Sequence, residues 1–180
     1  LKHLQTDYLD LFLLHRPRPL MQTDEVLEAV SHLKSSGKIK SFVVSNFTPQ
    51  QIDYLSKEVE VEANQIQCSL THYEPMQDDR LFYHEQHDII TMAWSPLGGV
   101  HKIEKHSELK KALSEQSVKY ECTESQMVLA WLLKHPAKIH PVLGTSKTKR
   151  IEEALGAQKI ELSLQDWFML YQASRGVEVD

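Results

Sequence analysis

The sequence predicts an α/β fold, in which a parallel sheet is built from strands that alternate with helices. Two observations carry this prediction: five short apolar runs recur along the chain, and a segment with helical periodicity follows each of them. A third observation concerns function, because polar or small residues follow the end of every predicted strand. The carboxyl ends of parallel strands meet at one side of a fold, so these residues should lie together.

The size and composition of the chain fit a globular protein. It has 180 residues, of which 41% are hydrophobic and 25% charged, close to the averages for globular domains. The net charge of −5 argues against a nucleic-acid partner, which would require a basic surface. The apolar runs are too short to cross a membrane, and two widely spaced cysteines indicate no disulfide framework. We therefore expect one cytoplasmic domain with neither a nucleic-acid nor a membrane partner.

The first two predicted strands are Leu9–Leu14 and Ser41–Ser45. Between them, we expect Thr23 to cap a helix and Gly37 to end it. The second strand is followed by Thr48-Pro49-Gln50-Gln51, which combines a capping threonine, a proline at the first helical position and a glutamine at the third. This combination predicts the start of the next helix.

The rest of the chain repeats this alternation. The remaining predicted strands are Ala63–Ile66, Asp88–Ala93 and Ile139–Leu143. The remaining predicted helices cover Asp79–His87, about Glu108–Tyr120, the residues after the capping box Thr123-Glu124-Ser125-Gln126, the residues capped by Thr148, and a terminal segment that begins at Ser163. Together these elements form five strand–helix units and one extra helix.

A doubly wound sheet and a (β/α) barrel both fit this alternation. The first strand is not followed by a G-x-G-x-x-G loop, so the dinucleotide-binding doubly wound fold lacks its main signature. Polar residues at all five strand ends favour a barrel, whose sites gather at that end. These residues are His15, Ser45-Asn46, Asn64-Gln65, Trp94-Ser95 and Gly144-Thr145-Ser146.

Five motifs in the chain resemble those of the aldo-keto reductases, in the order in which that family carries them. The motifs are Asp7–Leu11 leading into Leu14-His15-Arg16-Pro17, Gly37–Lys40 followed by Val43–Phe47, Asn64–Gln67, Ala93–Gly99, and Gly144–Ser146. They span nearly the whole chain. The segments Arg16–Leu20 and Trp94–Gly99 most resemble bacterial oxidoreductases of this family.

The resemblance implies a TIM barrel that reduces an aldehyde or ketone to an alcohol with NADPH. A complete barrel has eight strand–helix units, so residues 1–180 are expected to be the C-terminal portion of one barrel domain, with about five units and a C-terminal helix. Hydride transfer places negative charge on the carbonyl oxygen, which then needs a hydrogen-bond donor. His15 matches the family histidine that polarises this small-molecule carbonyl substrate; the alternative is a histidine that merely closes a strand.

The resemblance also assigns residues around the nicotinamide. Ser45, Asn46 and Gln65 match residues that hydrogen-bond the carboxamide and so fix which face of the ring reacts. Trp94 matches the aromatic residue that stacks on the ring. Turn formation by Asn46 and ordinary core packing of Trp94 are the alternatives.

The loops after the last two predicted strands match the place where many barrels bind phosphate. Lys147 and Arg150 bring positive charge to the start of a helix, which suits the 2′-phosphate of NADP; a solvated basic turn is the alternative. Gly144 and Ala154 stand where the family often has lysine and asparagine. The cofactor-binding residues implied in this region are Ser95, Leu97, Gly99, Thr145, Ser146, Lys147, Arg150 and Glu153.

The family's proton-donor tyrosine, with its lysine and aspartate, belongs to strands one to three, which the resemblance places ahead of Leu1. We therefore expect these residues to be inactive alone, the full-length protein to be a monomer, and a truncated chain to dimerise or aggregate through open sheet edges. Two alternatives stay open: a non-catalytic NADP-binding or regulatory module, and a metal-dependent hydrolase that uses His15 and His72. His84 and His87 are expected on a solvated helix face, with no metal site.

Overall fold

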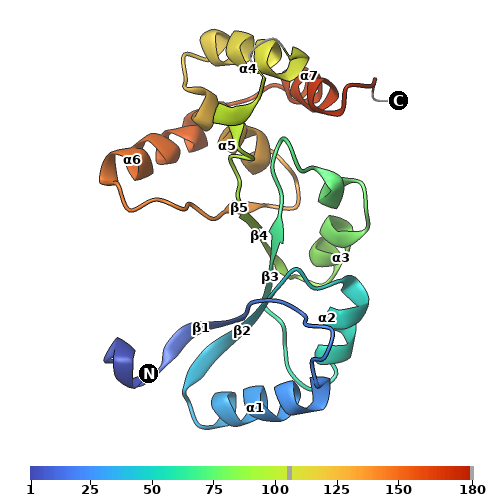
Figure 1. The fold of residues 1–180 in the computed structure, drawn as a ribbon, viewed down its shortest axis with the longest axis vertical. Helices are drawn as coiled ribbons and strands as arrows, with labels where there is room; N and C mark the ends of the chain where they lie inside the picture. Colours follow the sequence, from blue (N-terminus) through green and yellow to red (C-terminus); the bar gives the residue numbers. More distant parts are fainter. Residues whose placement is uncertain (105–106, 179–180) are drawn as a thin grey trace. The chain divides into compact units, whose positions relative to one another are not determined.

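The structure is a computed structural model that describes residues 1–104 and 107–178. Its five-stranded sheet has the order β1-β2-β3-β4-β5, and at least one helix follows each strand (Figure 1). The strands are β1 (Leu9–Leu14), β2 (Ile39–Ser45), β3 (Ala63–Gln67), β4 (Ile90–Trp94) and β5 (His140–Pro141). The helices are α1 (Thr23–Ser35), α2 (Pro49–Leu55), α3 (Arg80–Gln86), α4 (Glu108–Lys119), α5 (Glu124–Leu133), α6 (Thr148–Gly156) and α7 (Leu164–Arg175). The predicted alternation of strands and helices is confirmed.

The chain packs as two compact units. Unit 1 comprises residues 1–66 and 78–92, and unit 2 comprises residues 67–77 and 93–180. β3 and β4 each begin in unit 1 and end in unit 2. The expectation that residues 1–180 are one portion of a single barrel domain stays a prediction.

The strands of unit 1 are parallel. β1 pairs with β2, and β2 pairs with β3, in parallel register. In the second pair, Ser45 lies opposite Gln65. Because parallel neighbours run in the same direction, the carboxyl ends of β2 and β3 meet at one edge of the sheet.

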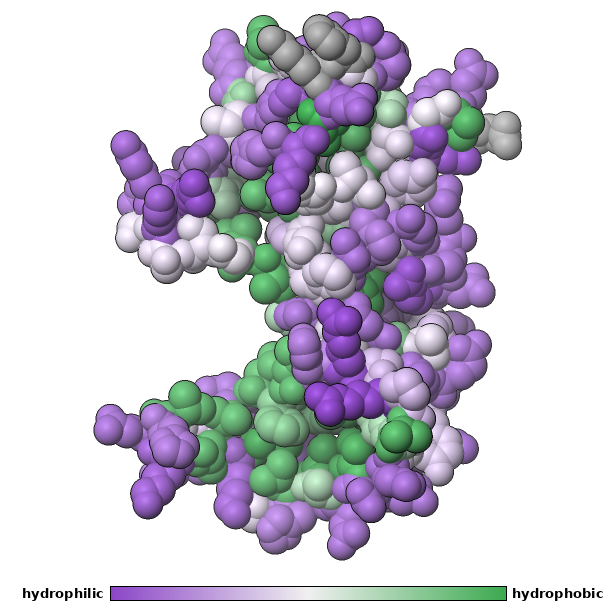
Figure 2. All heavy atoms as spheres, in the orientation of Figure 1, coloured by the Kyte–Doolittle hydropathy of each residue, from purple (hydrophilic) through white to green (hydrophobic). Residues whose placement is uncertain are grey.

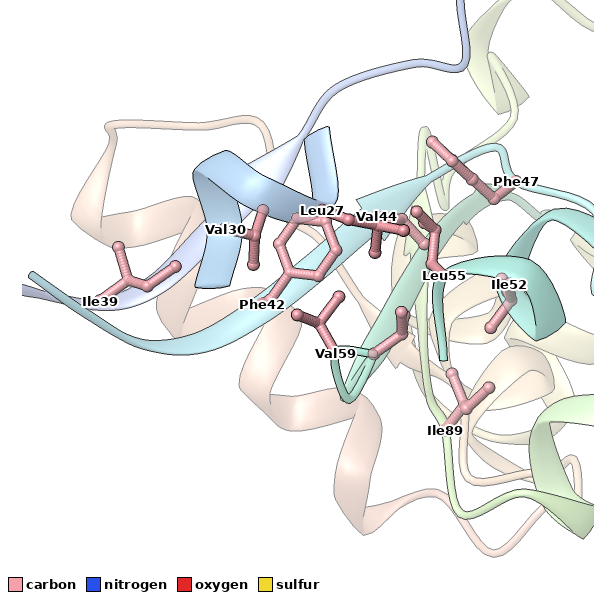
Figure 3. Packing of buried hydrophobic residues seen from close by; sticks show 11 residues of the cluster. Leu27, Val30, Ile39, Phe42, Val44, Phe47, Ile52, Leu55, Val59 and Ile89 are labelled. Atoms are coloured by element: carbon pink, nitrogen blue, oxygen red, sulfur yellow. The ribbon is translucent and has the colours of Figure 1, made fainter. Parts of the chain in front are cut away.

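The core of unit 1 lies where α1 and α2 cover β2 (Figure 3). Phe42 and Val44 are two positions apart on β2, so they face the same side and pack against the helices. Burial of a large apolar side chain contributes about 1.5–3 kcal/mol, so this cluster anchors β2 and the polar residues at its end. The helical residues in the cluster are Leu27 and Val30 of α1 and Ile52 and Leu55 of α2.

The outer strand β1 is covered only in part by the described residues. Its residue Leu11 is 46% exposed, and hydrophobic side chains gather on the surface of unit 1 around β1 and β2 (Figure 2). An apolar edge strand of this kind can pair with a further strand. The expected association through this edge stays a prediction.

The capping boxes predicted at Thr48 and Thr123 are confirmed. Each threonine Oγ1 accepts from the N–H of the glutamine three residues later, at 3.3 Å and 3.2 Å. The glutamine Oε1 accepts in return from the threonine N–H, at 3.0 Å in both boxes. These bonds satisfy N–H groups that have no partner within a helix.

The caps predicted at Thr23 and Thr148 were wrong. Both threonines are the first residues of their helices, and the preceding Gln22 and Lys147 occupy the cap position without a side-chain cap bond. A threonine suits either position, so only the extended backbone of the preceding residue decides.

Among residues 1–104 and 107–178, every helix is too short or too polar to span a bilayer.

Four of the five strands differ in extent from their predicted bounds. β2 begins at Ile39 rather than Ser41, and β3 ends at Gln67 rather than Ile66. β4 begins at Ile90 rather than Asp88, because Asp88 has a φ of 55°, a left-handed conformation that a strand does not allow. β5 covers only His140–Pro141, and Pro141 has no N–H to donate to a ladder. After it, the Val142 N–H donates to the oxygen of Ala93 at 2.9 Å.

Helix α5 lies at the centre of unit 2 and is joined to α7 by a pair of tryptophans. Trp131 Nε1 donates to the Trp167 main-chain oxygen at 3.2 Å, and Trp167 Nε1 donates to that of Trp131 at 2.9 Å. The two rings stack with centroids 4.9 Å apart. Both indole donors are therefore satisfied while the rings are buried, which avoids the cost of an unpaired donor.

A buried carboxylate joins α7 to α4. Asp166 is 2% exposed and accepts from Lys119 Nζ at 2.8 Å, Tyr120 Oη at 2.6 Å and Ser163 Oγ at 2.6 Å. The hydrogen bond from Lys119, followed by those from Ser163 and Tyr120, lowers the pKa of Asp166 to about 2. The folded state therefore favours the charged carboxylate.

We predict that Asp166→Asn lowers the free energy of unfolding at neutral pH by about 1–3 kcal/mol, because three donors lose their charged acceptor. An unfolded aspartate has a pKa of about 3.9, so the stabilisation is complete above that pH and is lost as the pH falls through about 2. Urea titrations from about pH 5 to pH 3 should therefore show the difference between wild type and variant narrowing.

Asp10→Asn is the control for this prediction. Asp10 bonds Lys40 Nζ at 2.7 Å, but its side chain is 78% exposed, so solvent screens the pair. We expect its removal to change the unfolding free energy little at any pH. Equal losses in the two variants would contradict the role of Asp166.

Candidate functional site

Three predicted site residues meet at the ends of β2 and β3 in unit 1. Ser45 Oγ donates to the main-chain oxygen of Gln65 at 2.8 Å, and the Asn46 N–H donates to the same oxygen at 3.0 Å. Asn46 Nδ2 donates to Ser45 Oγ at 3.0 Å. The parallel register thus brings Ser45, Asn46 and Gln65 into one hydrogen-bonded group.

Two residues directly after strands adopt a left-handed backbone. Asn46 follows β2 with a φ of 60°, and Ser95 follows β4 with a φ of 50°. Such a conformation costs a residue other than glycine about 1–3 kcal/mol and persists only where its surroundings hold it. It occurs disproportionately at functional sites, but Gln5, Asp88, Glu121 and Lys138 adopt it too, so the backbone conformation alone does not mark a site.

A row of buried, hydrogen-bonded polar side chains begins at Asn64, the residue before Gln65. Asn64 Nδ2 donates to the Phe47 oxygen at 2.9 Å and lies 3.1 Å from His84 Nε2, while His84 Nδ1 lies 2.9 Å from Thr91 Oγ1. Burial, followed by the charge of Arg80, lowers the pKa of His84 to about 4. The neutral ring can then accept from Asn64 through Nε2 and donate to Thr91 through Nδ1.

The expectation of a solvated face for His84 was wrong. His84 is 1% exposed, because α3 turns this residue toward β3 and β4. His87 is exposed, as expected, and its ring stacks on that of Tyr83 with centroids 4.1 Å apart. The sequence spacing of the two histidines predicts a shared helix face, but the two rings have different environments.

Unit 2 contains a pocket of about 630 Å³. The loop after β4, the start of α5, the segment after β5 and one face of α6 form its walls. Its volume lies in the range of small-ligand sites. Six of the predicted cofactor-binding residues line it: Ser95, Leu97, Gly99, Thr145, Arg150 and Glu153. Ser146 and Lys147 belong to the same segment but lie outside this lining.

The loop after β4 is held close to another part of unit 2. Thr71 Oγ1 donates to the oxygen of Gly98 at 2.6 Å. Gly98 has a φ of 55°, and a Cβ there would overlap Thr71 Oγ1 and lie 2.6 Å from Ser69 Oγ. Only glycine allows both this backbone conformation and this close approach. Sequence reasoning missed Thr71 because it lies 27 residues before Gly98.

The start of α6 gives the pocket its positive charge. Arg150 lies in the first turn of α6, where main-chain N–H groups and the helix dipole favour an anion. Glu153 lies one turn later on the same wall. Ser125 and Leu129 of α5 also line the pocket and were not predicted. Ser125 could have been suspected, since it lies within the capping box identified at the start of α5.

The other predicted residues are placed as follows. His15 of unit 1 follows β1 directly and is exposed, and Trp94 of unit 2 ends β4 and is half-buried. His72 Nδ1 lies 3.3 Å from Glu74 Oε2. Within the part of the chain that the structure describes, no group of three or more His, Cys, Asp or Glu side chains could hold a metal ion.

Comparison with known proteins identifies the family. The model of the aldo/keto reductase family matches residues 1–175. A 6-dehydroglucose reductase of Agrobacterium fabrum is 37% identical over 186 aligned residues, which cover 99% of this chain and 61% of the relative. Oxidoreductase YdhF of Escherichia coli is 36% identical over 182 aligned residues, which cover 98% of this chain and 61% of the relative. The chain thus spans about three fifths of the length of these relatives.

Solved structures give the same result. A crystal structure of an aldo/keto reductase from Klebsiella pneumoniae with NADP and acetate superposes with a TM-score of 0.82 at 25% identity, covering 99% of this chain and 62% of that one. A thermostable aldo-keto reductase bound to the inhibitor epalrestat gives a TM-score of 0.86 at 26% identity, covering 96% of this chain and 62% of that one. The predicted fold class, an incomplete (β/α) barrel, is confirmed. With a family match over nearly its whole length, the chain belongs to the aldo/keto reductase family.

Proposed function

We propose that the protein is an oxidoreductase that reduces an aldehyde or ketone to an alcohol with NADPH. The observation that carries this proposal is the pocket of unit 2, where six residues predicted from the family motifs line one cavity. The relatives named as reductases and the related structures with bound NADP or NADPH support it. When bound, NADPH supplies the hydride that passes to the carbonyl carbon.

The pocket fits the adenosine and phosphate end of NADPH. Gly99 has a φ of 70° and no neighbouring atom within 4 Å of where a Cβ would be, which leaves room for a phosphate against the backbone. The Thr145 hydroxyl and the Arg150 guanidinium are donors that suit phosphate oxygens. We assign the 2′-phosphate to Arg150 and the adenine to Glu153.

Residues at the strand ends would orient the nicotinamide and the substrate. Ser45, Asn46 and Gln65 carry hydroxyl and amide groups that can bond the carboxamide. Hydrogen bonds hold the side chains of Ser45 and Asn46, while Gln65 contributes its main-chain oxygen to them. Trp94 offers a flat surface for the ring. His15, exposed after β1, would donate to the carbonyl oxygen as negative charge develops there.

No tyrosine in these residues is proposed as the proton donor. The chain has six tyrosines, and three of them donate their hydroxyl to an aspartate. Tyr83 Oη donates to Asp53 Oδ1 at 2.6 Å, and burial, followed by this carboxylate, raises its pKa far above the ordinary value. The other five contact the following groups: Tyr8 the Lys40 ammonium, Tyr54 Asp24, Tyr120 Asp166, and Tyr73 and Tyr171 each other.

We predict that the purified chain of 180 residues binds NADPH but does not reduce benzaldehyde. The chain should bind NADPH because Ser45, Arg150 and the loop with Gly98 and Gly99 are present. Reduction of the aldehyde also needs a proton donor, which these residues do not supply. Fluorescence titration of NADPH measures the first, and NADPH absorbance with benzaldehyde measures the second. Absence of binding would refute the cofactor assignment, and rapid turnover would refute the statement about the proton donor.

We predict that Gly98→Ala weakens NADPH binding about tenfold or more, because the loop after β4 must move away from Thr71 and Ser69. Gly37→Ala is the control for the left-handed backbone alone. Gly37 has a φ of 67°, but no atom lies within 4 Å of the place that its Cβ would take, and it lies outside the pocket lining. Titration of both variants should show an effect of Gly98→Ala alone, and circular dichroism should show that both fold. Similar affinities for the two variants would exclude this role for the loop.

We predict that Arg150→Ala weakens NADPH binding about tenfold and NADH binding little, since only NADPH carries the 2′-phosphate. Lys149→Ala removes the same charge from the neighbouring position, which lies outside the pocket lining, and should leave both affinities nearly unchanged. Parallel titrations with the two nucleotides make the measurement. If Arg150→Ala weakens NADH binding to the same extent, Arg150 contacts a part of the cofactor other than the 2′-phosphate.

A further inference from the structure

The capping box that starts α5 makes a second set of hydrogen bonds, to α6. Thr123 Oγ1 accepts the Gln126 N–H within the box and donates to Glu153 Oε1 at 2.7 Å. Gln126 Oε1 accepts the Thr123 N–H, and its Nε2 donates to the Glu153 main-chain oxygen at 2.9 Å. Two side chains of α5 thus hold both the backbone and the carboxylate of one residue in the pocket wall.

Helix α6 buries little of its own surface, although Ala157, which caps its C-terminus, is 1% exposed and packs with α5. All nine of its residues are described, and each of them stays at least partly exposed. Its main apolar contact is Ala154, which packs beside the small cluster that contains Leu129 and Ala130 of α5. Helices in proteins owe most of their stability to a buried face, so a helix without one depends more on its hydrogen bonds.

Gly156 shows how closely α5 and α6, neighbours in unit 2 (Figure 1), approach each other. A Cβ at Gly156 would collide with Gln126 Nε2, the atom that bonds the Glu153 oxygen. Any other residue there would push the amide away. The glycine that ends α6 therefore allows the hydrogen bond that holds the middle of the helix.

The chain contains a second capping box that lacks this link. Thr48 and Gln51 at the start of α2 make the same two internal bonds, at 3.3 Å and 3.0 Å. Among the described residues, the hydrogen bonds of these two side chains stay within the box. A bridge to another helix is thus an addition to ordinary capping, and it occurs where α5 borders the pocket.

We infer that Thr123 and Gln126 are positioning residues, which hold α6 so that Arg150 and Glu153 face the pocket. Arg150 and Glu153 lie one turn apart on α6, so any rotation or outward shift of the helix moves both. Neither Thr123 nor Gln126 lines the pocket, so they act through α6 rather than by touching a ligand. The effect on the cofactor rests on the function proposed above, whereas the effect on α6 does not.

Gln126→Ala and Gln51→Ala form a matched pair for the test. Both substitutions remove one internal capping bond, and only the first removes the bond to Glu153. We expect Gln126→Ala to weaken NADPH binding about fivefold, the effect of about one lost hydrogen bond on a positioned group, and Gln51→Ala to leave it within about twofold. Hydrogen exchange of the ligand-free chain should be faster in residues 148–156 for the first variant alone.

Substitution of the threonine tests the same link through its hydroxyl. Thr123→Ser keeps the hydroxyl and should match wild type in both measurements. Thr123→Val loses both the cap of α5 and the bond to Glu153, so Thr48→Val, which loses only a cap, is its control, and exchange in residues 148–156 should be faster for Thr123→Val alone. Equal effects of Gln126→Ala and Gln51→Ala on α6 exchange and on NADPH affinity would overturn the inference. If wild type binds no NADPH, the proposed function and the predicted effect on affinity both fail, and α6 exchange alone then confirms or overturns the positioning of the helix.

Discussion

The reciprocal hydrogen bonds between Trp131 and Trp167 hold the helix on which unit 2 is built. Each indole donates to the other residue's backbone while the rings stack, so two large side chains are buried with no unpaired donor. Because α5 is held in this way, its first turns can serve other purposes. Ser125 and Leu129 line the pocket, and Thr123 and Gln126 reach α6. Helix α5, held by the two tryptophans, thus supports α6, an exposed helix that carries Arg150 and Glu153.

The two groups of site residues are held by different physical means. At the end of β2, Asn46 keeps a left-handed backbone because its N–H, like the Ser45 hydroxyl, donates to the Gln65 oxygen. In unit 2, the loop after β4 depends on glycine, since Gly98 lies against Thr71 too closely for any side chain. Both means are common in preorganised binding sites. In the first, hydrogen bonds hold a strained backbone, and in the second, a glycine lets two segments of backbone approach closely.

Much of this arrangement could be predicted because its signals are local. The capping boxes at Thr48 and Thr123 join residues three positions apart, so their bonds could be read directly from the sequence. The bond from Thr71 to Gly98 and the burial of His84 against Asn64 could not be read in this way. Their partners lie 27 and 20 positions away in the sequence. The sequence of a short helix does not show whether its histidine faces solvent or a sheet.

The sequence by itself determined the order of strands and helices, the capping boxes that start α2 and α5, and the motifs that mark the family. These follow from periodicity and spacing within a few residues, which each segment carries whatever its surroundings. Only the tertiary structure decided that six of the predicted residues share one pocket, that His84 is neutral, and that Glu153 is held from α5. Burial and long-range hydrogen bonds depend on which segments meet, and that is settled only when the chain has packed.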